Sequence, residues 1–198
     1  MMNRTELLKI LAEHRTDEVV VFTQGAMHEW TDISPSPLNF VCSLAMGYAS
    51  SVALGIALAR PDKKVIVLDG DGSLLMNLGT LVTISNQSPS NLIYFVLDNG
   101  LYELPGQVPL PAADKISLAD FARGAGLTKV YQFDSLQELR EKAPAIMHEP
   151  GPIFIDVKVA PMHREILRVP IEFDFARQTE EALRAEQATV VSPMRRAE

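Results

Sequence analysis

Apolar stretches of strand length alternate along this chain with segments of helical character. Residues 64–69 (KVIVLD), 91–97 (NLIYFVL) and 152–159 (PIFIDVKV) are apolar at most positions, which is typical of strands that are buried on both faces of a parallel sheet. Helices that connect such strands cover the two faces of the sheet. The sequence therefore predicts an α/β fold, a single doubly wound parallel sheet with helices on both faces.

Periodicity and breaker residues predict the remaining elements. Asn3 and Glu6 have the spacing of a capping box at the start of a helix, and Asp134 with Gln137 has a similar spacing. We expect helices at 3–14, 43–60, 74–87 and 117–125 and after Asp134, strands at 18–22 and 129–133, a turn at 70–73, and loops at 23–37 and 98–116. The expected domain covers 1–172, and 173–198 forms a charged C-terminal helix and tail.

Charge and cysteine content limit the partners and the compartment. The 198 residues carry a net charge of -7, which argues against nucleic acid as the main partner, because phosphate contacts need clustered Lys and Arg. Cys42 is the single cysteine, which is compatible with a reducing compartment. The sequence contains neither an apolar run of the roughly 18–20 residues that span a membrane nor a signal-peptide core at its start. We therefore expect a cytoplasmic protein that does not bind membranes.

Two polar segments follow neighbouring strands, VIVLDGDGS and IYFVLDNG. Asp71 and Asn99 are 28 residues apart, which is the length of one helix and one strand, so both side chains converge at one edge of the sheet. Their oxygens and a backbone carbonyl suit Mg²⁺. Gly70 and Gly72 allow a diphosphate to approach the backbone, and the amides of Gly72 and Ser73 open a helix whose N-terminus favours anions.

This pair of segments resembles the motif of enzymes that use thiamine diphosphate (ThDP), a GDG followed by an Asn. In that family the Asp, the Asn and a carbonyl two residues later hold a metal ion on the diphosphate. The resemblance implies these metal-binding roles for Asp71, Asn99 and Leu101. Residues 43–84 resemble the corresponding part of sulfopyruvate and phosphonopyruvate decarboxylases, and the similarity is strongest over 23–101. It implies the diphosphate-binding (PP) type of the ThDP fold.

The same resemblance implies further contacts with the cofactor. Met46 precedes a glycine and corresponds to the apolar residue that wedges under ThDP and holds it in a V shape. Gln24, Gly25 and Ala26 lie where the family contacts the diphosphate end. After Asn99, only Gly106 and Gln107 resemble the Gly-Gly-Gln-Pro-Thr-like run of related decarboxylases, so the substrate stays open.

A partner chain is expected from what the family needs in addition. The activating Glu of ThDP enzymes comes from a separate pyrimidine-binding domain, and only 22 residues precede Thr23. Some sulfopyruvate decarboxylases divide the two halves between subunits. The resemblance thus implies a ThDP- and Mg²⁺-binding subunit of a hetero-oligomeric 2-oxo acid decarboxylase, with sulfopyruvate or a phosphonopyruvate-like compound as substrate and the activating Glu on a pyrimidine-binding (alpha-type) subunit.

Other functions remain open at this point. The run from Asp69 to Ser73 also fits haloacid-dehalogenase-like phosphatases, with Asp69 as nucleophile and Asp71 as general acid, although the later Asp-Asp pair is missing. An acetolactate synthase-like enzyme and a non-catalytic ThDP-binding module are further alternatives. The side chains of His28, Glu29 and Glu103 face either a substrate or solvent. His148 and His163 lack the spacing of zinc ligands.

Overall fold

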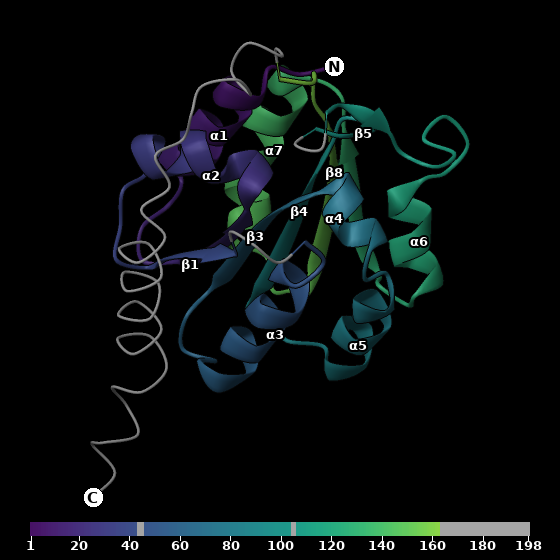
Figure 1. The fold of residues 1–198 in the computed structure, drawn as a ribbon. Coiled ribbons are helices and arrows are strands. Elements are labelled where there is room, and N and C mark those ends of the chain that lie inside the picture. Colours follow the sequence, from purple (N-terminus) through teal and green to yellow (C-terminus); the bar gives the residue numbers. More distant parts are fainter. Residues whose placement is uncertain (43–45, 104–105, 163–198) are drawn as a thin grey trace, which may run out of the picture.

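The core of the computed structural model is one six-stranded sheet in which all paired strands are parallel (Figure 1). The structure describes residues 1–42, 46–103 and 106–162. In spatial order the strands are β2 (Asn39–Cys42), β1 (Val19–Thr23), β3 (Val65–Gly70), β4 (Leu92–Asp98), β8 (Ile153–Lys158) and β7 (Lys129–Phe133). The expected parallel α/β sheet is confirmed.

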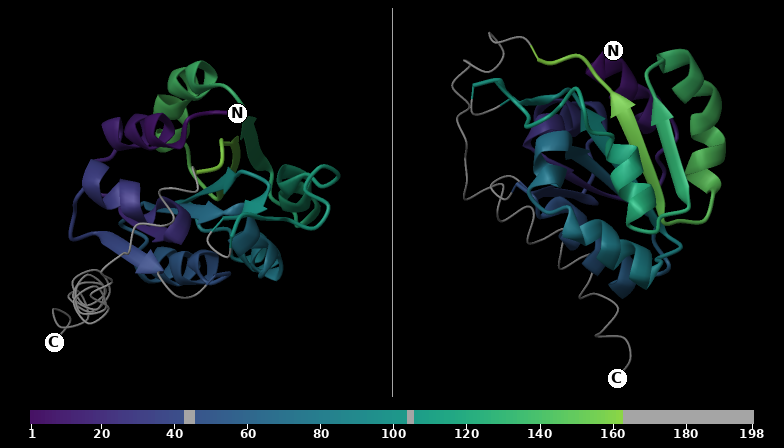
Figure 2. Two further views of the ribbon diagram at one scale, coloured as in Figure 1. Left: turned by 45° about the horizontal axis from the view of Figure 1, so that its top comes forward. Right: turned by 90° about the vertical axis from the view of Figure 1, so that its right-hand side faces the viewer.

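Helices cover both faces of this sheet (Figure 2). On one face lie α1 (Arg4–Glu13), α2 (Gln24–Ile33) and α7 (Leu136–His148), and on the other lie α3 (Ala49–Ala59), α5 (Gly79–Gln87) and α6 (Leu118–Gly124). The short α4 (Asp71–Leu75) follows β3 directly. Successive strand residues alternate between the two cores, as Val21 and Phe22 of β1 do, because strand side chains have a period of two.

The order of the strands marks the edge where a ligand should bind. The chain passes from β1 outwards to β2 and then returns to β3 on the other side of β1, which makes a topological switch point between β1 and β3. The helices α2 and α4 begin at the carboxyl ends of these two strands. A small antiparallel hairpin of β5 (Leu101–Tyr102) and β6 (Val108–Pro109) follows β4 at the same edge.

Some of the expected helix caps and boundaries are confirmed, and others are wrong. Asn3 and Ser117 cap their helices as expected, since their side chains accept the amides of Glu6 and Asp120. The cap at Asp134 is wrong, because Ser135 accepts the amide of Glu138 instead. The helix expected at 43–60 begins only at Ala49 in the described part.

Two expected irregular segments are in fact partly regular. The loop expected at 23–37 contains α2, whose Ala26, Trp30 and Ile33 pack on the core, and it is followed by the edge strand β2. The turn expected at 70–73 is the start of α4, and the helix expected at 74–87 is divided between α4 and α5. His163 and the expected tail at 173–198 lie outside the described residues.

Within 1–42, 46–103 and 106–162, no helix combines the length and the apolar character that a bilayer crossing needs.

Cys42, at the end of β2, is buried, and burial together with the charge of Asp69 raises the pKa of its thiol to about 12. Burial thus disfavours the thiolate form that a nucleophile needs.

Candidate functional site

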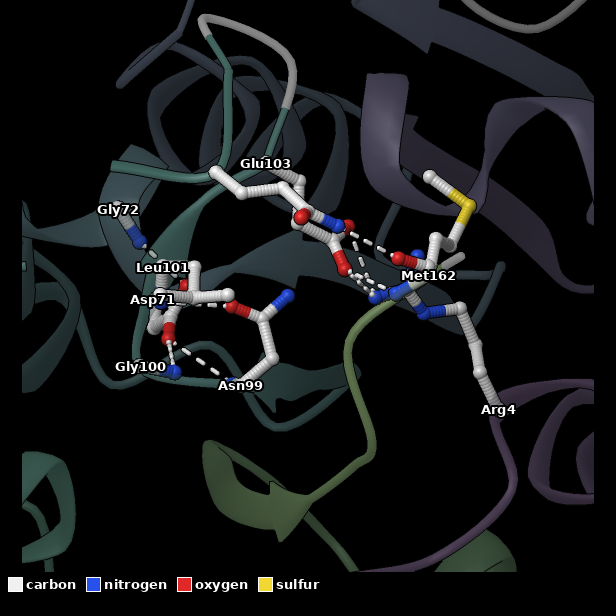
Figure 3. A network of polar contacts seen from close by, with 9 residues as sticks. Arg4, Asp71, Gly72, Asn99, Gly100, Leu101, Glu103 and Met162 are labelled. Atoms are coloured by element: carbon white, nitrogen blue, oxygen red, sulfur yellow. Dashed lines mark hydrogen bonds and ion pairs between the residues drawn. The ribbon is translucent and has the colours of Figure 1, made fainter. Parts of the chain in front are cut away.

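Asp71 and Asn99 lie beside each other where β3 and β4 end (Figure 3). The Oδ2 atom of Asp71 accepts the amides of Asn99 at 2.9 Å and Gly100 at 2.6 Å, and its Oδ1 accepts the amide of Gly72 at 2.7 Å. The Oδ1 atom of Asn99 accepts the amide of Leu101 at 2.8 Å. The 28-residue spacing thus brings the carboxylate, the side-chain amide and the Leu101 loop to one place.

Burial gives the Asp71 carboxyl unusual titration behaviour. Its residue is 2% exposed, and this desolvation raises the pKa of Asp71 to about 7. The nearby charge of Asp98 adds to the rise, while the hydrogen bonds from Gly100, Gly72 and Asn99 oppose it. A cation bound to this carboxylate would favour its ionised form.

The chemistry of the available donors decides which metal fits. In the parts of the chain that the structure describes, there is no group of three or more His, Cys, Asp or Glu side chains that could hold a metal ion. The donors at the candidate site are instead a carboxylate of Asp71, an amide oxygen of Asn99 and a backbone carbonyl of Leu101. All are oxygen donors, which fits Mg²⁺ with its remaining positions left to phosphate oxygens and water.

The two glycines beside Asp71 have different surroundings. A Cβ atom built on Gly70 would meet nothing within 4 Å among the described residues, so this glycine leaves room at the carboxyl end of β3. A Cβ atom on Gly72 would lie 2.5 and 2.6 Å from two ring atoms of Tyr102. The amide of Gly72 already donates to Asp71. Gly70 therefore leaves open space beside the backbone, while Gly72 makes room for the Tyr102 ring. The expected diphosphate contacts of the two glycines stay a prediction.

Ser73 connects the start of α4 to the turn that carries Met46. Its hydroxyl oxygen accepts the amide of Gly47 at 2.9 Å, and the side chain of Asn77 donates to the Gly47 carbonyl at 2.8 Å. Gly47 has a φ of +84°, a conformation that favours glycine. These bonds hold the half-buried Met46 beside the Asp71 segment. Asn77 was missed at the sequence level, because a polar residue between two helices carries no signal of its partner.

A buried polar network lies under the site. Asp69 is 0% exposed, accepts the amide of Gly70 at 2.9 Å and the hydroxyl of Tyr94 at 2.8 Å, and is also bonded by the hydroxyls of Ser73 and Thr23. Burial raises the pKa of Asp69 and places that of Tyr94 well above its ordinary value. A phosphatase nucleophile must reach its substrate, so this enclosed position argues against that role for Asp69.

The first turn of α2 reaches the same edge of the sheet from β1. Gln24, Gly25 and Ala26 form this turn, whose backbone amides have no partner within the helix. The side chain of Ala26 is fully buried in the core, so any contact of Ala26 with an anion is made by the backbone. Glu29, further along α2, accepts the hydroxyl of Thr5 in α1. Glu29 therefore ties α2 to α1 instead of facing only solvent.

The side chain of Glu103, which was expected to face either a substrate or solvent, is buried in an ion pair. It is 7% exposed, and its carboxylate accepts Nη2 of Arg4 at 2.8 and 2.9 Å and the amide of Met162 at 2.7 Å (Figure 3). The sequence offers no sign of this contact, because Arg4 and Glu103 are 99 positions apart and belong to no common motif.

Comparisons with known proteins agree with this geometry. The model of the family described as thiamine pyrophosphate enzyme, C-terminal TPP binding domain, matches residues 23–157. The chain is 39% identical to the sulfopyruvate decarboxylase subunit beta of Methanothermobacter thermautotrophicus, over 84% of this chain and 86% of that protein. It is 36% identical to the phosphonopyruvate decarboxylase of Streptomyces viridochromogenes, over 78% of this chain and 39% of that protein.

A solved structure shows the same fold. The benzoylformate decarboxylase of Polynucleobacter necessarius superposes with a TM-score of 0.68 at 18% identity, over 81% of this chain and 34% of that chain. At this identity the likeness concerns the fold alone. The resemblance expected from the GDG and Asn segments is confirmed by the family match and by the relatives.

Proposed function

The chain belongs to the thiamine pyrophosphate (ThDP) enzyme family, and we propose that it is the ThDP- and Mg²⁺-binding subunit of a two-subunit 2-oxo acid decarboxylase. The observation that carries this proposal is the meeting of Asp71 and Asn99 at the carboxyl edge of the sheet, next to the switch point between β1 and β3. Ligands of doubly wound sheets bind at that position.

The residues at this edge would bind different parts of the cofactor and its metal ion. Asp71, Asn99 and the Leu101 carbonyl would bind Mg²⁺, and the oxygen of Asn99 keeps a second lone pair beside the one that accepts the Leu101 amide. The open side of Gly70 would admit the diphosphate. When bound, ThDP supplies the electron sink for loss of CO₂ from a 2-oxo acid.

Two further segments would complete the cofactor contacts, namely the first turn of α2 and the turn that carries Met46. The first-turn amides of Gln24, Gly25 and Ala26 favour an anion through the helix N-terminus. Ser73 holds the turn of Met46, which would support the pyrimidine end of the cofactor. These residues of the chain bind and orient, and they leave proton transfer at the aminopyrimidine to a Glu of the partner.

The proposal of a partner and a substrate is supported by the names of the relatives. The relative from Methanothermobacter thermautotrophicus is called a subunit beta, and the present chain covers 86% of it. A pyrimidine-binding subunit would supply the activating Glu. Sulfopyruvate or a phosphonopyruvate-like compound is the proposed substrate, and the cytoplasm is the proposed compartment.

Calorimetry with ThDP and Mg²⁺ on the full chain tests the cofactor site. Asp71→Ala should lose measurable ThDP affinity, because it removes the charged metal ligand. Asp62→Ala is the matched control, since it removes an exposed carboxylate that precedes β3 and thus lies near the amino end of the same strand. Equal ThDP affinity of the wild type and Asp71→Ala would refute the proposed site.

Activity assays test the subunit arrangement. The chain should release CO₂ from sulfopyruvate or phosphonopyruvate only when a pyrimidine-binding subunit from the same genome is added. Ordinary turnover by the chain alone would contradict the two-subunit arrangement. ThDP binding without turnover in any combination would indicate a non-catalytic binding module.

A further inference from the structure

The loop that carries Asn99 and Leu101 is fixed at two ends. At its start, the amides of Asn99 and Gly100 donate to the Asp71 carboxylate at 2.9 and 2.6 Å. At its far end, Glu103 meets Arg4 in an ion pair whose side chains are 6% and 4% exposed (Figure 3). Leu101 lies between the two fixed points, so its carbonyl depends on both.

Arg4 belongs to a part of the chain that is itself tied to the sheet. It begins α1, and the preceding Met2 pairs with the end of β8. The Met2 amide donates to the Lys158 carbonyl at 2.8 Å, and the Ala160 amide donates to the Met2 carbonyl at 2.8 Å. Glu103 is therefore anchored against the sheet through Arg4.

The described remainder of the loop is held by a short hairpin and by bonds that meet at Glu103 and Met162. In its described part the hairpin has two residue pairs, Leu101 with Pro109 and Tyr102 with Val108, and the Leu110 amide donates to the Gly100 carbonyl at 2.9 Å. Gln107 adds two bonds, since its backbone amide donates to the Glu103 carbonyl at 2.9 Å and its side chain donates to the Met162 carbonyl at 2.7 Å. A buried carboxylate is costly unless it is paired. The pairing of the Glu103 carboxylate with Arg4, and its bond from the Met162 amide at 2.7 Å, therefore favour the loop position that the structure shows.

We propose that Arg4 and Glu103 are positioning residues for the metal, which set the Asn99 oxygen and the Leu101 carbonyl relative to Asp71. This inference rests on the proposed function. The Glu103 carboxylate is bonded to Arg4 and to the Met162 amide, so both side chains would act through the loop and not as metal ligands. Mg²⁺ requires nearly ideal octahedral geometry at 2.0–2.1 Å, while Ca²⁺ accepts six to eight oxygens in flexible geometry at longer distances. A loosened loop should therefore weaken Mg²⁺ more than Ca²⁺.

The test measures the metal dependence of ThDP binding by calorimetry on the full chain, once with Mg²⁺ and once with Ca²⁺. In Glu103→Gln and in Arg4→Met, the half-saturating Mg²⁺ concentration should rise about 10-fold or more, as is typical when a residue that supports metal ligands is removed. The Ca²⁺ concentration should rise by less than about 3-fold, because that ion tolerates displaced ligands.

Two further variants separate positioning from folding. Each single variant leaves one buried charge without its partner, so the double variant Arg4→Met/Glu103→Gln removes both charges and is expected to fold with the same preferential loss of Mg²⁺. Leu139→Ala is the control for general destabilisation, since Leu139 is fully buried in α7 and packs in the same core as α1. It should lower the melting temperature and leave the ratio of Mg²⁺ to Ca²⁺ affinity unchanged.

The outcomes distinguish this inference from the function on which it rests. If Asp71→Ala loses ThDP binding while the Arg4 and Glu103 variants keep the wild-type ratio of the two metals, the positioning role is wrong and the cofactor site stands. An equal loss of both metals in these variants would mean a merely structural role and would also overturn the inference. If the wild type binds no ThDP with Mg²⁺, or if Asp71→Ala binds it equally well, the proposed function fails first.

Discussion

Replacing Gly72 by alanine should destabilise the protein through one identified contact. The added Cβ would lie 2.5 and 2.6 Å from the Cδ1 and Cε1 atoms of Tyr102, and 3.2 Å from Leu110. Carbon atoms in contact are normally about 3.5–4.0 Å apart, so the ring must move by roughly 1 Å. Such overpacking typically costs about 1–3 kcal/mol.

The position of Tyr102 narrows the expected loss of stability in Gly72→Ala. Its side chain is half-buried, so the ring has some freedom to move, while the buried Leu110 restricts movement on one side. We expect a loss of about 2 kcal/mol, which corresponds to a melting temperature lower by roughly 4–8 °C for a chain of this size. Movement of Tyr102 also shifts the neighbouring Leu101, so Mg²⁺-dependent ThDP affinity should fall as well.

Thermal unfolding of four proteins checks this reasoning: the wild type, Gly72→Ala, Tyr102→Ala and the double variant. The double variant should be more stable than the sum of the single effects predicts, by about 0.5–3 kcal/mol, because contacting residues couple. Gly70→Ala is the matched control, since its Cβ meets nothing within 4 Å in the described chain and its backbone is extended with φ −95°. A wild-type melting temperature for Gly72→Ala, or strict additivity in the double variant, would refute the explanation.

Three further changes have expected outcomes that urea unfolding or calorimetry can measure. Burial, with the charge of Asp98, raises the pKa of the fully buried Asp156 from 3.8 to about 6, against the effect of Lys158. The pKa of Asp156 is higher in the folded than in the unfolded protein, so the free energy of unfolding should fall by about 3 kcal/mol as pH rises from 4 to 6. Asp156→Asn should remove this pH dependence. An unchanged pH profile in the variant would contradict the role of Asp156. Tyr94→Phe removes a donor to the buried Asp69 and should cost about 1–3 kcal/mol at pH 7, whereas wild-type stability would mean that another group replaces the hydroxyl. Ser73→Ala removes the acceptor of the Gly47 amide and should cost about 1 kcal/mol and weaken ThDP binding, and unchanged binding would separate the Met46 turn from the cofactor.

The elements that could be predicted from the sequence are those whose signal lies within the element. The strands β3, β4 and β8 are apolar on both faces, and the convergence of Asp71 and Asn99 follows from their spacing and the parallel order. The helix α2 was missed because Gly25 and the prolines near its end suggested a loop, although Ala26 and Trp30 lie on one helical face. The edge strand β2 was missed because three of its four residues are only half-buried and it has no long apolar run.

The site contains two kinds of residue, and they differ in how well the sequence indicates them. Asp71 and Asn99 directly follow strands, where the order of the sheet alone brings polar groups together. The packing partner of Gly72 is 30 positions away in Tyr102, and the partner of Glu103 is 99 positions away in Arg4. Such pairs depend on how separate segments dock, for which neither periodicity nor spacing gives a rule.

The range matched by the family model is shorter than the part of the chain that forms the core. The family model matches residues 23–157, yet Leu7, Leu8 and Leu11 of α1 are fully or almost fully buried in the core under the sheet. Met2 extends the hydrogen bonding of β8, and both Arg4 and Met162 hold the loop that follows Asn99. Segments outside the matched range therefore supply part of the core and support the loop that follows Asn99. Since removing them would expose apolar surface and leave Glu103 buried without Arg4, the smallest unit that keeps an ordered site includes the N-terminal helix and the residues up to at least Met162.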